Sequence, residues 1–213
     1  MSKLRLTITM SLDGYVAGPD QSEENPLGVG GMDLHQWLFP LEAFREAHGG
    51  HGGETNASSE VVEERRANIG ATIMGRNMFG PVRGAWPDES WRGWWGEDPP
   101  YHHPVFVLTH HSRQPLQMEG GTTFHFVSDG LEPALQQAKQ AAKGKDVRIG
   151  GGPSVIRQYL VAGHIDQMHL AVSPVLLGEG EHLFSGINLP QLGFAPFRTV
   201  PGENATHVFI EKR

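Results

Sequence analysis

The stretch VRIGGGPSVIRQYL at residues 147–160 sets three consecutive glycines between a short apolar run and an amphipathic run. The apolar run predicts a β-strand, and the amphipathic run predicts a helix that begins at Pro153, because proline suits the first helical position. A tight turn with positive φ needs one glycine, whereas Gly150, Gly151 and Gly152 together let a ligand approach the backbone closely. We therefore expect this strand-to-helix turn to hold an anion such as a diphosphate, with a simple tight turn as the alternative.

Strand and helix patterns alternate on both sides of this turn. Apolar runs and alternating patterns predict strands at residues 4–10, 71–75, 104–110, 122–127, 147–151, 166–178, 194–200 and 205–213. Helical spacing predicts helices at residues 32–48 with a break at Pro40, at 58–70, at 128–145 with Asp129 as the N-cap, and at 153–163. This order predicts one α/β domain over residues 1–213, with a mainly parallel central sheet flanked by helices and an antiparallel C-terminal strand pair.

Composition excludes several functional classes. The 213 residues carry a net charge of -7 with no basic cluster, so we expect no nucleic-acid partner. The chain has no cysteine, which excludes disulfides, cysteine-based zinc sites and thiol nucleophiles and suits a reducing compartment. Neither a signal-peptide core nor a run of 18 apolar residues is present, so we expect a cytoplasmic protein without a membrane partner.

A second expected strand also ends at a potential anion site. The strand at residues 71–75 ends at Gly75, and Arg76 and Asn77 follow at an expected helix start. A guanidinium beside free backbone amides is suited to a phosphate group. An ordinary surface turn is the alternative interpretation of this Gly-Arg pair.

A third strand leads into the polar sequence THHSR. Thr109, His110 and His111 follow the buried run at residues 104–108. Neighbouring histidines on an extended chain point to opposite sides, and the sequence has no HExxH spacing, so we expect no metal site. An anion-binding loop fits these residues better, and three such strand ends suit a ligand with several phosphates.

Five segments in order carry a resemblance to a known family. TMSLDGYVAG, TIMGRNMFG, VFVLTHHSR, VRIGGGPSVIRQYL and IDQMHLAVSPVLLGEGEHLF resemble the dihydrofolate reductase-like superfamily, in particular the reductase domain of the bacterial bifunctional riboflavin-biosynthesis deaminase-reductase and its stand-alone relatives. The resemblance runs from about Lys3 to near the C-terminus. It implies a dihydrofolate reductase-like fold, NADPH as the cofactor and hydride transfer to a small-molecule substrate.

The resemblance also implies roles for individual residues. In that family, the loop matching DGYVAG covers the nicotinamide, the Gly-Arg and Thr-His-His segments hold the adenosine 2′-phosphate end, and the glycine turn holds the diphosphate. The cofactor residues implied here are Val16, Ala17, Gly75, Arg76, Asn77, Thr109, His110, His111, Gly150, Gly151, Gly152 and Ser154.

The sequence departs from the riboflavin enzyme in ways that leave the substrate open. Thr7 stands where that enzyme usually has a lysine facing its substrate, and no zinc-binding deaminase half accompanies the matching segments. The acid of true dihydrofolate reductases lies on their first helix, but Asp33 has a different spacing from the first strand. A pterin, a pyrimidine, a similar planar heterocycle and a carbonyl compound all stay possible acceptors.

Three further residues are candidates for the chemistry. Asp13 follows the first strand beside the expected nicotinamide loop, where it either supplies a proton or caps a turn at Gly14. Asp33 either anchors a substrate amino group or is an ordinary acid in a first helical turn. Trp37 either forms the floor of a pocket for a flat substrate or lies in the core.

Two expectations concern function class and assembly. The alternative to a reductase is a non-catalytic nucleotide-binding protein on the same fold. Residues 166–178 are more apolar than an edge strand should be, and an exposed apolar edge of this length invites aggregation unless a partner covers it. Because related reductase domains also commonly pair, we expect a homodimer with the C-terminal strands near its interface. Cover of this edge by the C-terminal strands of the same chain is the alternative.

Overall fold

The computed structural model describes residues 2–80 and 84–213, which fall into two compact units. Unit 1 is formed by the first five residues and Asn68–His164, and unit 2 by Leu6–Ala67 and Ile165–Arg213. The expectation of one domain over residues 1–213 stays a prediction, and each unit is described by itself.

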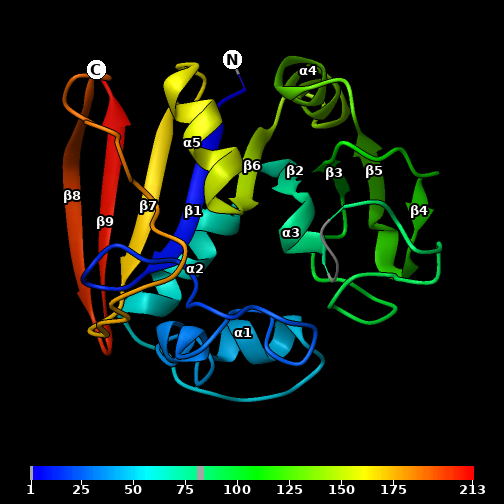
Figure 1. The fold of residues 1–213 in the computed structure, drawn as a ribbon. Helices are drawn as coiled ribbons and strands as arrows, with labels where there is room; N and C mark the ends of the chain where they lie inside the picture. Colours follow the sequence, from blue (N-terminus) through cyan, green and yellow to red (C-terminus); the bar gives the residue numbers. More distant parts are fainter. Residues whose placement is uncertain (1, 81–83) are drawn as a thin grey trace. The chain divides into compact units, whose positions relative to one another are not determined.

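Unit 1 contains strands in the order β4-β5-β3-β2-β6 (Figure 1). Strands β5, β3, β2 and β6 run parallel to one another, and the short β4 is antiparallel to β5. The strand bounds are Ile69–Gly75 for β2, Pro104–Leu108 for β3, Leu116–Gln117 for β4, Thr123–Val127 for β5 and Asp146–Gly151 for β6. Parallel strands buried on both faces are apolar throughout, which explains the short continuous runs in the sequence.

Helices α4 (Leu131–Ala141) and α5 (Pro153–Val161) pack on this sheet, α4 against β2 and β3 and α5 against β2 and β6. Helix α4 buries one face, as its spacing predicts. The expected N-cap at Asp129 is wrong, because the N-cap is Gly130 with φ 101° and no side chain caps the helix. Two single-turn helices, α3 (Arg76–Phe79) and η2 (Glu119–Gly121), complete unit 1.

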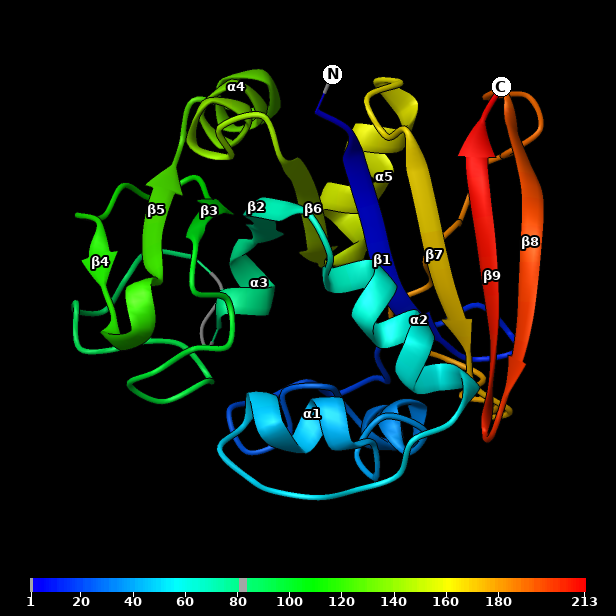
Figure 2. The same ribbon diagram turned by 180° about the vertical axis from the view of Figure 1, so that it is seen from behind.

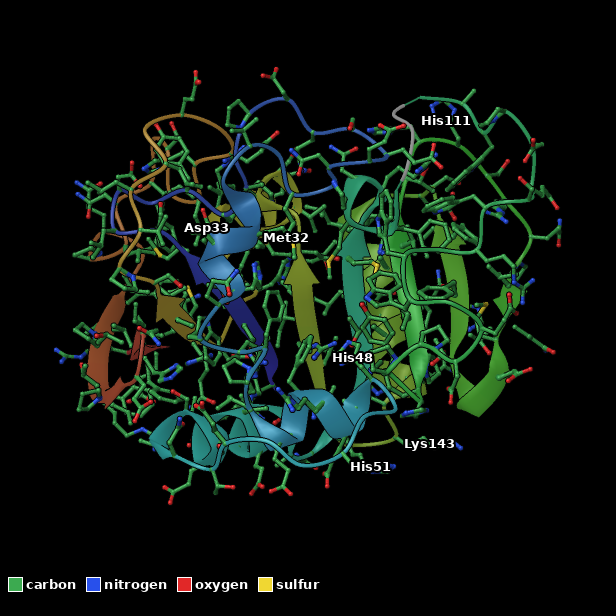
Figure 3. The ribbon with its side chains drawn as sticks, turned by 90° about the horizontal axis from the view of Figure 1, so that it is seen from below. Met32, Asp33, His48, His51, His111 and Lys143 are labelled. Atoms are coloured by element: carbon green, nitrogen blue, oxygen red, sulfur yellow. The ribbon has the colours of Figure 1, made fainter. Side chains whose placement is uncertain are left out.

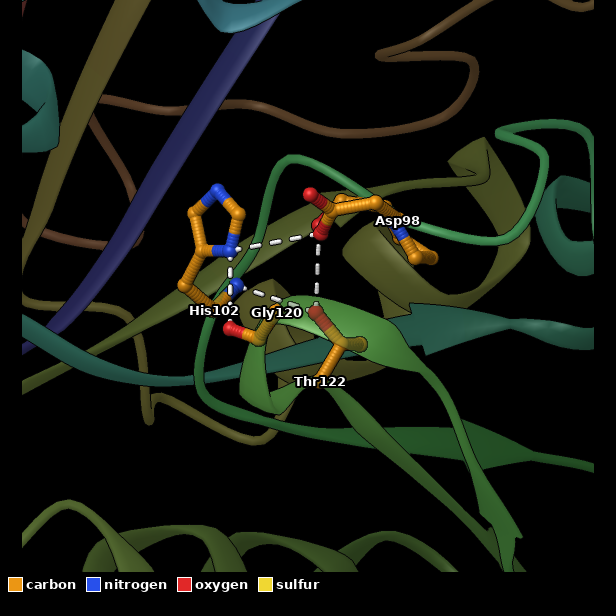
Figure 4. Close-up of polar contacts among 5 residues, drawn as sticks. Asp98, His102, Gly120 and Thr122 are labelled. Carbon is orange, nitrogen blue, oxygen red and sulfur yellow. Dashed lines mark hydrogen bonds and ion pairs between the residues drawn. The ribbon is translucent and has the colours of Figure 1, made fainter.

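The tryptophan-rich segment at residues 86–95 packs against an apolar cluster of unit 1. Trp86, Trp91 and Trp95 contact a core formed by Met74, Phe79, Tyr101, Val105, Val107, Met118 and Phe124. Polar contacts fix the end of this segment (Figure 4). The His102 amide donates to Thr122 Oγ1 at 3.0 Å, and His102 Nδ1 lies 2.9 Å from the Gly120 carbonyl oxygen. Trp86, Trp91 and Trp95 therefore extend the apolar core of unit 1, and His102 ties the residues that follow them to it.

Unit 2 contains strands in the order β1-β7-β9-β8 (Figure 2). Their bounds are Leu4–Met10 for β1, Gln167–Val172 for β7, Phe194–Gly202 for β8 and Ala205–Lys212 for β9. Strand β9 is antiparallel to both β7 and β8. The parallel strands of unit 1, the helices on the sheet and the antiparallel C-terminal pair confirm the expected α/β class.

The helices of unit 2 follow the predicted pattern. The helix expected at residues 32–48 breaks around Pro40 into η1 (Gly31–His35) and α1 (Glu42–Ala47). Helix α2 (Ala57–Arg66) packs against β8 and β9 and begins with a capping box between Asn56 and Ser59. Among the described residues, no helix is long and apolar enough to cross a membrane.

Strand β7 is shorter and better covered than the sequence suggests. It ends at Val172, before Pro174, because proline cannot donate a ladder hydrogen bond. Strand β9 pairs with β7 along its length, so the expectation of an exposed apolar edge here is wrong. The edge is β8, which carries Pro196 and Pro201 and an irregular register, features that protect sheet edges.

Candidate functional site

The three strand ends singled out in the sequence lie at one edge of the unit 1 sheet. Parallel pairing places Met74 of β2 opposite Gly151 of β6, and Gly75 opposite Leu108 of β3. A Cβ atom on Gly75 would lie 3.6 Å from the Gly152 amide nitrogen. The three strand ends therefore lie together at the carboxyl ends of neighbouring parallel strands.

Gly151 and Gly152 of the turn meet different structural requirements. Gly151 has φ 149°, a conformation that other residues rarely adopt, and a Cβ there would lie 3.0 Å from Met78 Sδ. Gly152 has φ -74°, and a Cβ there would meet no atom within 4 Å. The fold therefore explains Gly151, whereas at Gly152 it leaves open space beside the first turn of α5, where Ser154 is exposed.

Two buried arginines lie beside Trp86. Arg76 and Arg113 are each 9% exposed, and their Cζ atoms lie 3.3 Å and 5.0 Å from the centroid of the Trp86 ring. Arg76 Nη1 donates to the Gly80 carbonyl at 2.5 Å, and Arg113 Nη2 donates to the Glu89 carbonyl at 2.6 Å. Nε and Nη2 of Arg76 and Nη1 of Arg113 have no hydrogen-bond partner among the described residues.

Burial lowers the pKa of Arg113, and the nearby carboxylates of Glu89 and Asp88 oppose that shift. Burial, and then the charge of Arg113, lower the pKa of Arg76 to about 10, so both side chains stay charged at neutral pH. Buried charged groups without partners cost free energy, and an anion that accepts hydrogen bonds from them removes that cost. The three guanidinium nitrogens without a partner among the described residues are therefore candidate donors to an anion.

An open pocket of about 440 Å³ lies beside Trp86. Its lining residues are Ala85, Trp86, Asp88, Glu89, His110, His111 and Ser112. The Thr109 Oγ1 accepts from the His111 amide at 3.1 Å, and Trp86 Nε1 donates to the His111 carbonyl at 3.0 Å. The predicted anion loop thus lines a pocket whose lining also includes two acidic residues, Asp88 and Glu89. Asn77 is exposed on α3.

In unit 2, the loop that contains Val16 and Ala17 is held by a second segment. The Val16 amide donates to the Glu181 carbonyl at 2.9 Å, and the Glu181 amide donates to the Ala17 carbonyl at 2.9 Å. Val16 and Ala17 are 8% and 5% exposed. These backbone pairs give the loop a defined conformation.

The contacts of Asp13 favour the turn-cap interpretation over proton donation. Its carboxylate accepts from Ser11 Oγ at 2.5 Å and from the amides of Leu177 at 3.2 Å and Gly178 at 2.7 Å. The Ser11 bond is the largest cause that lowers the pKa of Asp13, with the Gly178 amide contributing in the same direction. A carboxylate held ionised by three donors is a poor proton source at neutral pH.

The two candidate substrate residues have different environments. Asp33 is exposed on η1, beside Met32 (Figure 3). Trp37 is 2% exposed and belongs to a core cluster with Leu38, Leu41 and Val62. This burial favours the core interpretation of Trp37 and leaves Asp33 accessible to a ligand.

The sequence places Arg113 in the predicted anion-binding loop and offers Trp86, like the other tryptophans, either as the floor of a pocket or as a core residue, but it indicates no contact between them. Arg113 lies four residues after Thr109 in the quoted sequence VFVLTHHSR, so its signal is present there. The contact of Trp86 with both arginines has no signal in the sequence, because it brings together residues that precede and follow strand β3.

The sequence is similar to a known protein family and to one curated protein. The family model described as the RibD C-terminal domain matches residues 2–205. The uncharacterized protein YyaP of Bacillus subtilis (strain 168) is 30% identical over 92 residues, which are 41% of this chain and 48% of YyaP. The matched region thus spans about half the length of this curated relative.

Three solved structures share the fold. A putative riboflavin biosynthesis protein from Shewanella sp. PV-4 has a TM-score of 0.61 and 21% identity, covering 99% of each chain. A diaminohydroxyphosphoribosylaminopyrimidine deaminase/5-amino-6-(5-phosphoribosylamino)uracil reductase from Thermotoga maritima has a TM-score of 0.56 and 14% identity, covering 100% of this chain and 57% of that one. Dihydrofolate reductase from Enterococcus faecalis, complexed with NADP(H) and RAB-propyl, has a TM-score of 0.53 and 16% identity, covering 99% and 96%. The expected dihydrofolate reductase-like fold is confirmed.

Proposed function

We propose that this chain, which belongs to the RibD C-terminal domain family, is an NADPH-dependent reductase that transfers a hydride to a small planar heterocycle or a carbonyl compound. The observation that carries the proposal is the pair of buried arginines beside Trp86, with three guanidinium nitrogens that have no partner among the described residues. These donors contact Trp86, which lines the open pocket, and they suit the adenosine 2′-phosphate, which distinguishes NADPH from NADH.

The rest of the cofactor has matching groups. The open space at Gly152 and the exposed Ser154 in the first turn of α5 support a diphosphate there, because amides at a helix start attract anions. His110 and His111 line the pocket of the adenosine end. In unit 2, Val16 and Ala17 are assigned to the nicotinamide by the family resemblance, and their backbone pairing with Glu181 supports a fixed wall.

The chemistry follows from these assignments. NADPH, when bound, supplies the hydride. The chain binds and orients the cofactor through the groups above, and orientation of this kind accounts for much of the rate of hydride transfer. Asp13 anchors the loop as an ionised carboxylate, so the proton for the reduced substrate comes from another donor. Asp33 is the accessible acid that we assign to substrate binding.

The test measures NADPH oxidation with a panel of pterin, pyrimidine, quinone and carbonyl acceptors, together with calorimetric binding of NADPH. The proposal predicts binding and acceptor-dependent oxidation. Binding without oxidation by any acceptor would favour the alternative, a non-catalytic nucleotide-binding protein. Absence of binding would overturn both.

A homodimer and a cytoplasmic location belong to the same proposal. Strand β7 is covered by β9 of the same chain, so it gives no argument for a dimer. Support for the dimer comes from the family resemblance. Light scattering at micromolar concentration is expected to give twice the 23.4 kDa mass of one chain. A mass close to that of one chain would contradict the dimer.

A further inference from the structure

We propose that His182 is a positioning residue, whose ring packs against the bare Cα of Gly14 and holds residues 14–17 in the conformation that the nicotinamide meets. This inference rests on the proposed function. The sequence GEGEH around His182 has the composition of an ordinary turn and lies within the segments that carry the family resemblance, but none of the cofactor assignments includes it.

The loop and the His182 segment form a short antiparallel ladder in unit 2. Tyr15 and His182 are paired as an isolated antiparallel bridge. The Leu183 amide donates to the Gly14 carbonyl at 2.9 Å, and the pairs between Glu181 and both Val16 and Ala17 continue the ladder. His182 therefore lies opposite the centre of the loop assigned to the nicotinamide.

Two side-chain contacts orient the His182 ring. The Phe184 amide donates to Nδ1 at 3.2 Å, so Nδ1 carries no proton and the other ring nitrogen, Nε2, faces Gly14. The Tyr15 ring lies edge-on to the imidazole, with centroids 5.2 Å apart and planes at 84°. The imidazole is thus fixed by its own backbone on one side and by the loop on the other.

Gly14 leaves the space that this ring occupies. A Cβ on Gly14 would lie 2.6 Å from His182 Nε2, and Gly14 has φ 91°. Gly180, two residues before His182, also leaves no room for a side chain, because a Cβ there would lie 2.2 Å from the Ala17 carbonyl oxygen. Two glycines on facing segments therefore let the backbones approach until the ring contacts the loop.

The His182 side chain restricts motion of the loop that the backbone ladder alone leaves possible. Backbone pairs fix which residues face each other and are available to any residue at position 182. Only a ring at this position fills the volume over Gly14 and contacts Tyr15, which restricts the remaining motion of the loop. Because hydride transfer is sensitive to misplacement on the order of 1 Å, a loosened wall lowers turnover more than binding.

Two variants separate the contributions of His182. His182→Asn keeps an acceptor for the Phe184 amide and removes the ring, whereas His182→Phe keeps a ring and removes the acceptor. His164→Asn is the matched control, since His164 pairs with Glu132 in unit 1 and has no role in the loop. We expect His182→Asn to lower kcat about 10-fold or more. We expect His182→Phe to keep most of the turnover and the control to keep all of it.

Binding and exchange measurements make the test independent of a total loss of activity. The affinity of His182→Asn for adenosine 2′,5′-bisphosphate is expected to equal that of the wild type, because this ligand lacks the nicotinamide. Hydrogen exchange at residues 11–18 of the ligand-free protein is expected to be faster in His182→Asn than in the wild type. Equal exchange and equal kcat in these two proteins would overturn the positioning role.

The outcomes also distinguish this inference from the proposed function. A wild-type protein that neither binds nor oxidises NADPH would overturn the reductase proposal and, with it, the role of His182. A wild type that turns over while His182→Asn has the same kcat, KM and exchange would overturn the positioning role alone. If His182→Asn does not fold, Gly14→Ala is the second variant, because its added methyl group displaces the His182 ring. This variant is expected to lower kcat while KM stays close to that of the wild type.

Discussion

The guanidinium carbon of Arg76 lies 3.3 Å from the centroid of the Trp86 ring, in stacking contact. This contact and the bond from Nη1 to the Gly80 carbonyl fix the orientation of the guanidinium before any ligand arrives. Arg113 approaches the same ring at 5.0 Å. A ligand phosphate therefore meets donors that are already in place, which limits the entropy cost of binding.

Replacing Arg113 is expected to reduce the preference for NADPH. Arg113→Met keeps much of the aliphatic volume and removes a donor that has an unpartnered nitrogen. The expected result is a 10- to 100-fold weaker affinity for NADPH, on the order of one charge-assisted hydrogen bond, with a much smaller change for NADH. Calorimetry with both cofactors measures the two affinities.

The control for that experiment is Arg92→Met. Arg92 lies in the segment before β3, is exposed and pairs with Glu97 at 3.1 Å. Its replacement is expected to leave both affinities unchanged. An equal loss in the two variants would indicate a general effect of charge, and no loss in Arg113→Met would remove Arg113 from the phosphate site.

The carboxylates of the pocket are expected to weaken NADPH binding. Asp88 is engaged by Ser90, whose hydroxyl and amide both donate to it. Glu89 lines the same pocket and its backbone accepts from Arg113. Glu89→Gln removes a negative charge near the expected phosphate and is expected to tighten NADPH binding several-fold at low salt, while NADH changes less. A weaker affinity for NADPH in this variant would instead indicate that Glu89 binds a ribose hydroxyl.

Gly152 offers a cleaner test of the diphosphate site than its neighbour. Gly152→Val is expected to leave the melting temperature nearly unchanged, because a Cβ there meets no atom within 4 Å, and to weaken NADPH binding by at least about 10-fold. Gly151→Val is expected to destabilise the protein, because φ 149° disfavours any branched residue. An unchanged affinity in folded Gly152→Val would mean that the glycines serve only the turn.

How much the sequence predicts depends on the range of the interaction. The period of apolar residues gives α5 and β6 almost to the residue, and Pro40 marks the break between η1 and α1, because these features are local. The covered position of β7 depends on pairing with β9, more than thirty residues further along the chain. Pairing at that separation leaves no local signal, which is why β7 looks like an exposed edge in the sequence.

In the candidate site, too, local sequence patterns predict some features, whereas contacts between separate segments have no local signal. Gly75 and Gly151 come together because adjacent parallel strands end at one edge, which the strand pattern indicates. The stacking of Arg76 on Trp86 depends on how a long loop folds back, and no pattern within that loop specifies it. Asp13 has the same sequence whether it caps a turn or donates a proton, and only its three donors distinguish the two roles.

Acid is expected to destabilise the protein through a buried histidine. His207 Nε2 lies 2.9 Å from Ser58 Oγ, and its Nδ1 lies 3.1 Å from His169 Nε2. Burial, and then the charge of Arg65, lower the pKa of His207 to about 4. Since an unfolded histidine titrates near about 6.5, the unfolded chain binds more protons between these two values. The free energy of unfolding is therefore full above about pH 6.5 and falls as the pH drops toward 4.

Urea unfolding at several pH values measures this loss. His207→Gln cannot gain the proton, so its free energy of unfolding is expected to fall less between pH 7 and pH 4.5 than that of the wild type, by on the order of 2 kcal/mol. His103, whose pKa burial also lowers to about 4, contributes its own part of the loss in unit 1. His51→Gln is the exposed control, and a pH dependence identical in all three proteins would contradict the role of His207.

The most direct test of the central claim is a calorimetric titration of the wild-type protein with NADPH and NADH at low salt and neutral pH. The two ligands differ only in the 2′-phosphate, which is the group assigned to Arg76 and Arg113. The account predicts that NADPH binds at least about 10-fold more tightly than NADH, as expected for a charge-assisted hydrogen bond to a buried guanidinium. Equal dissociation constants for the two cofactors would contradict it.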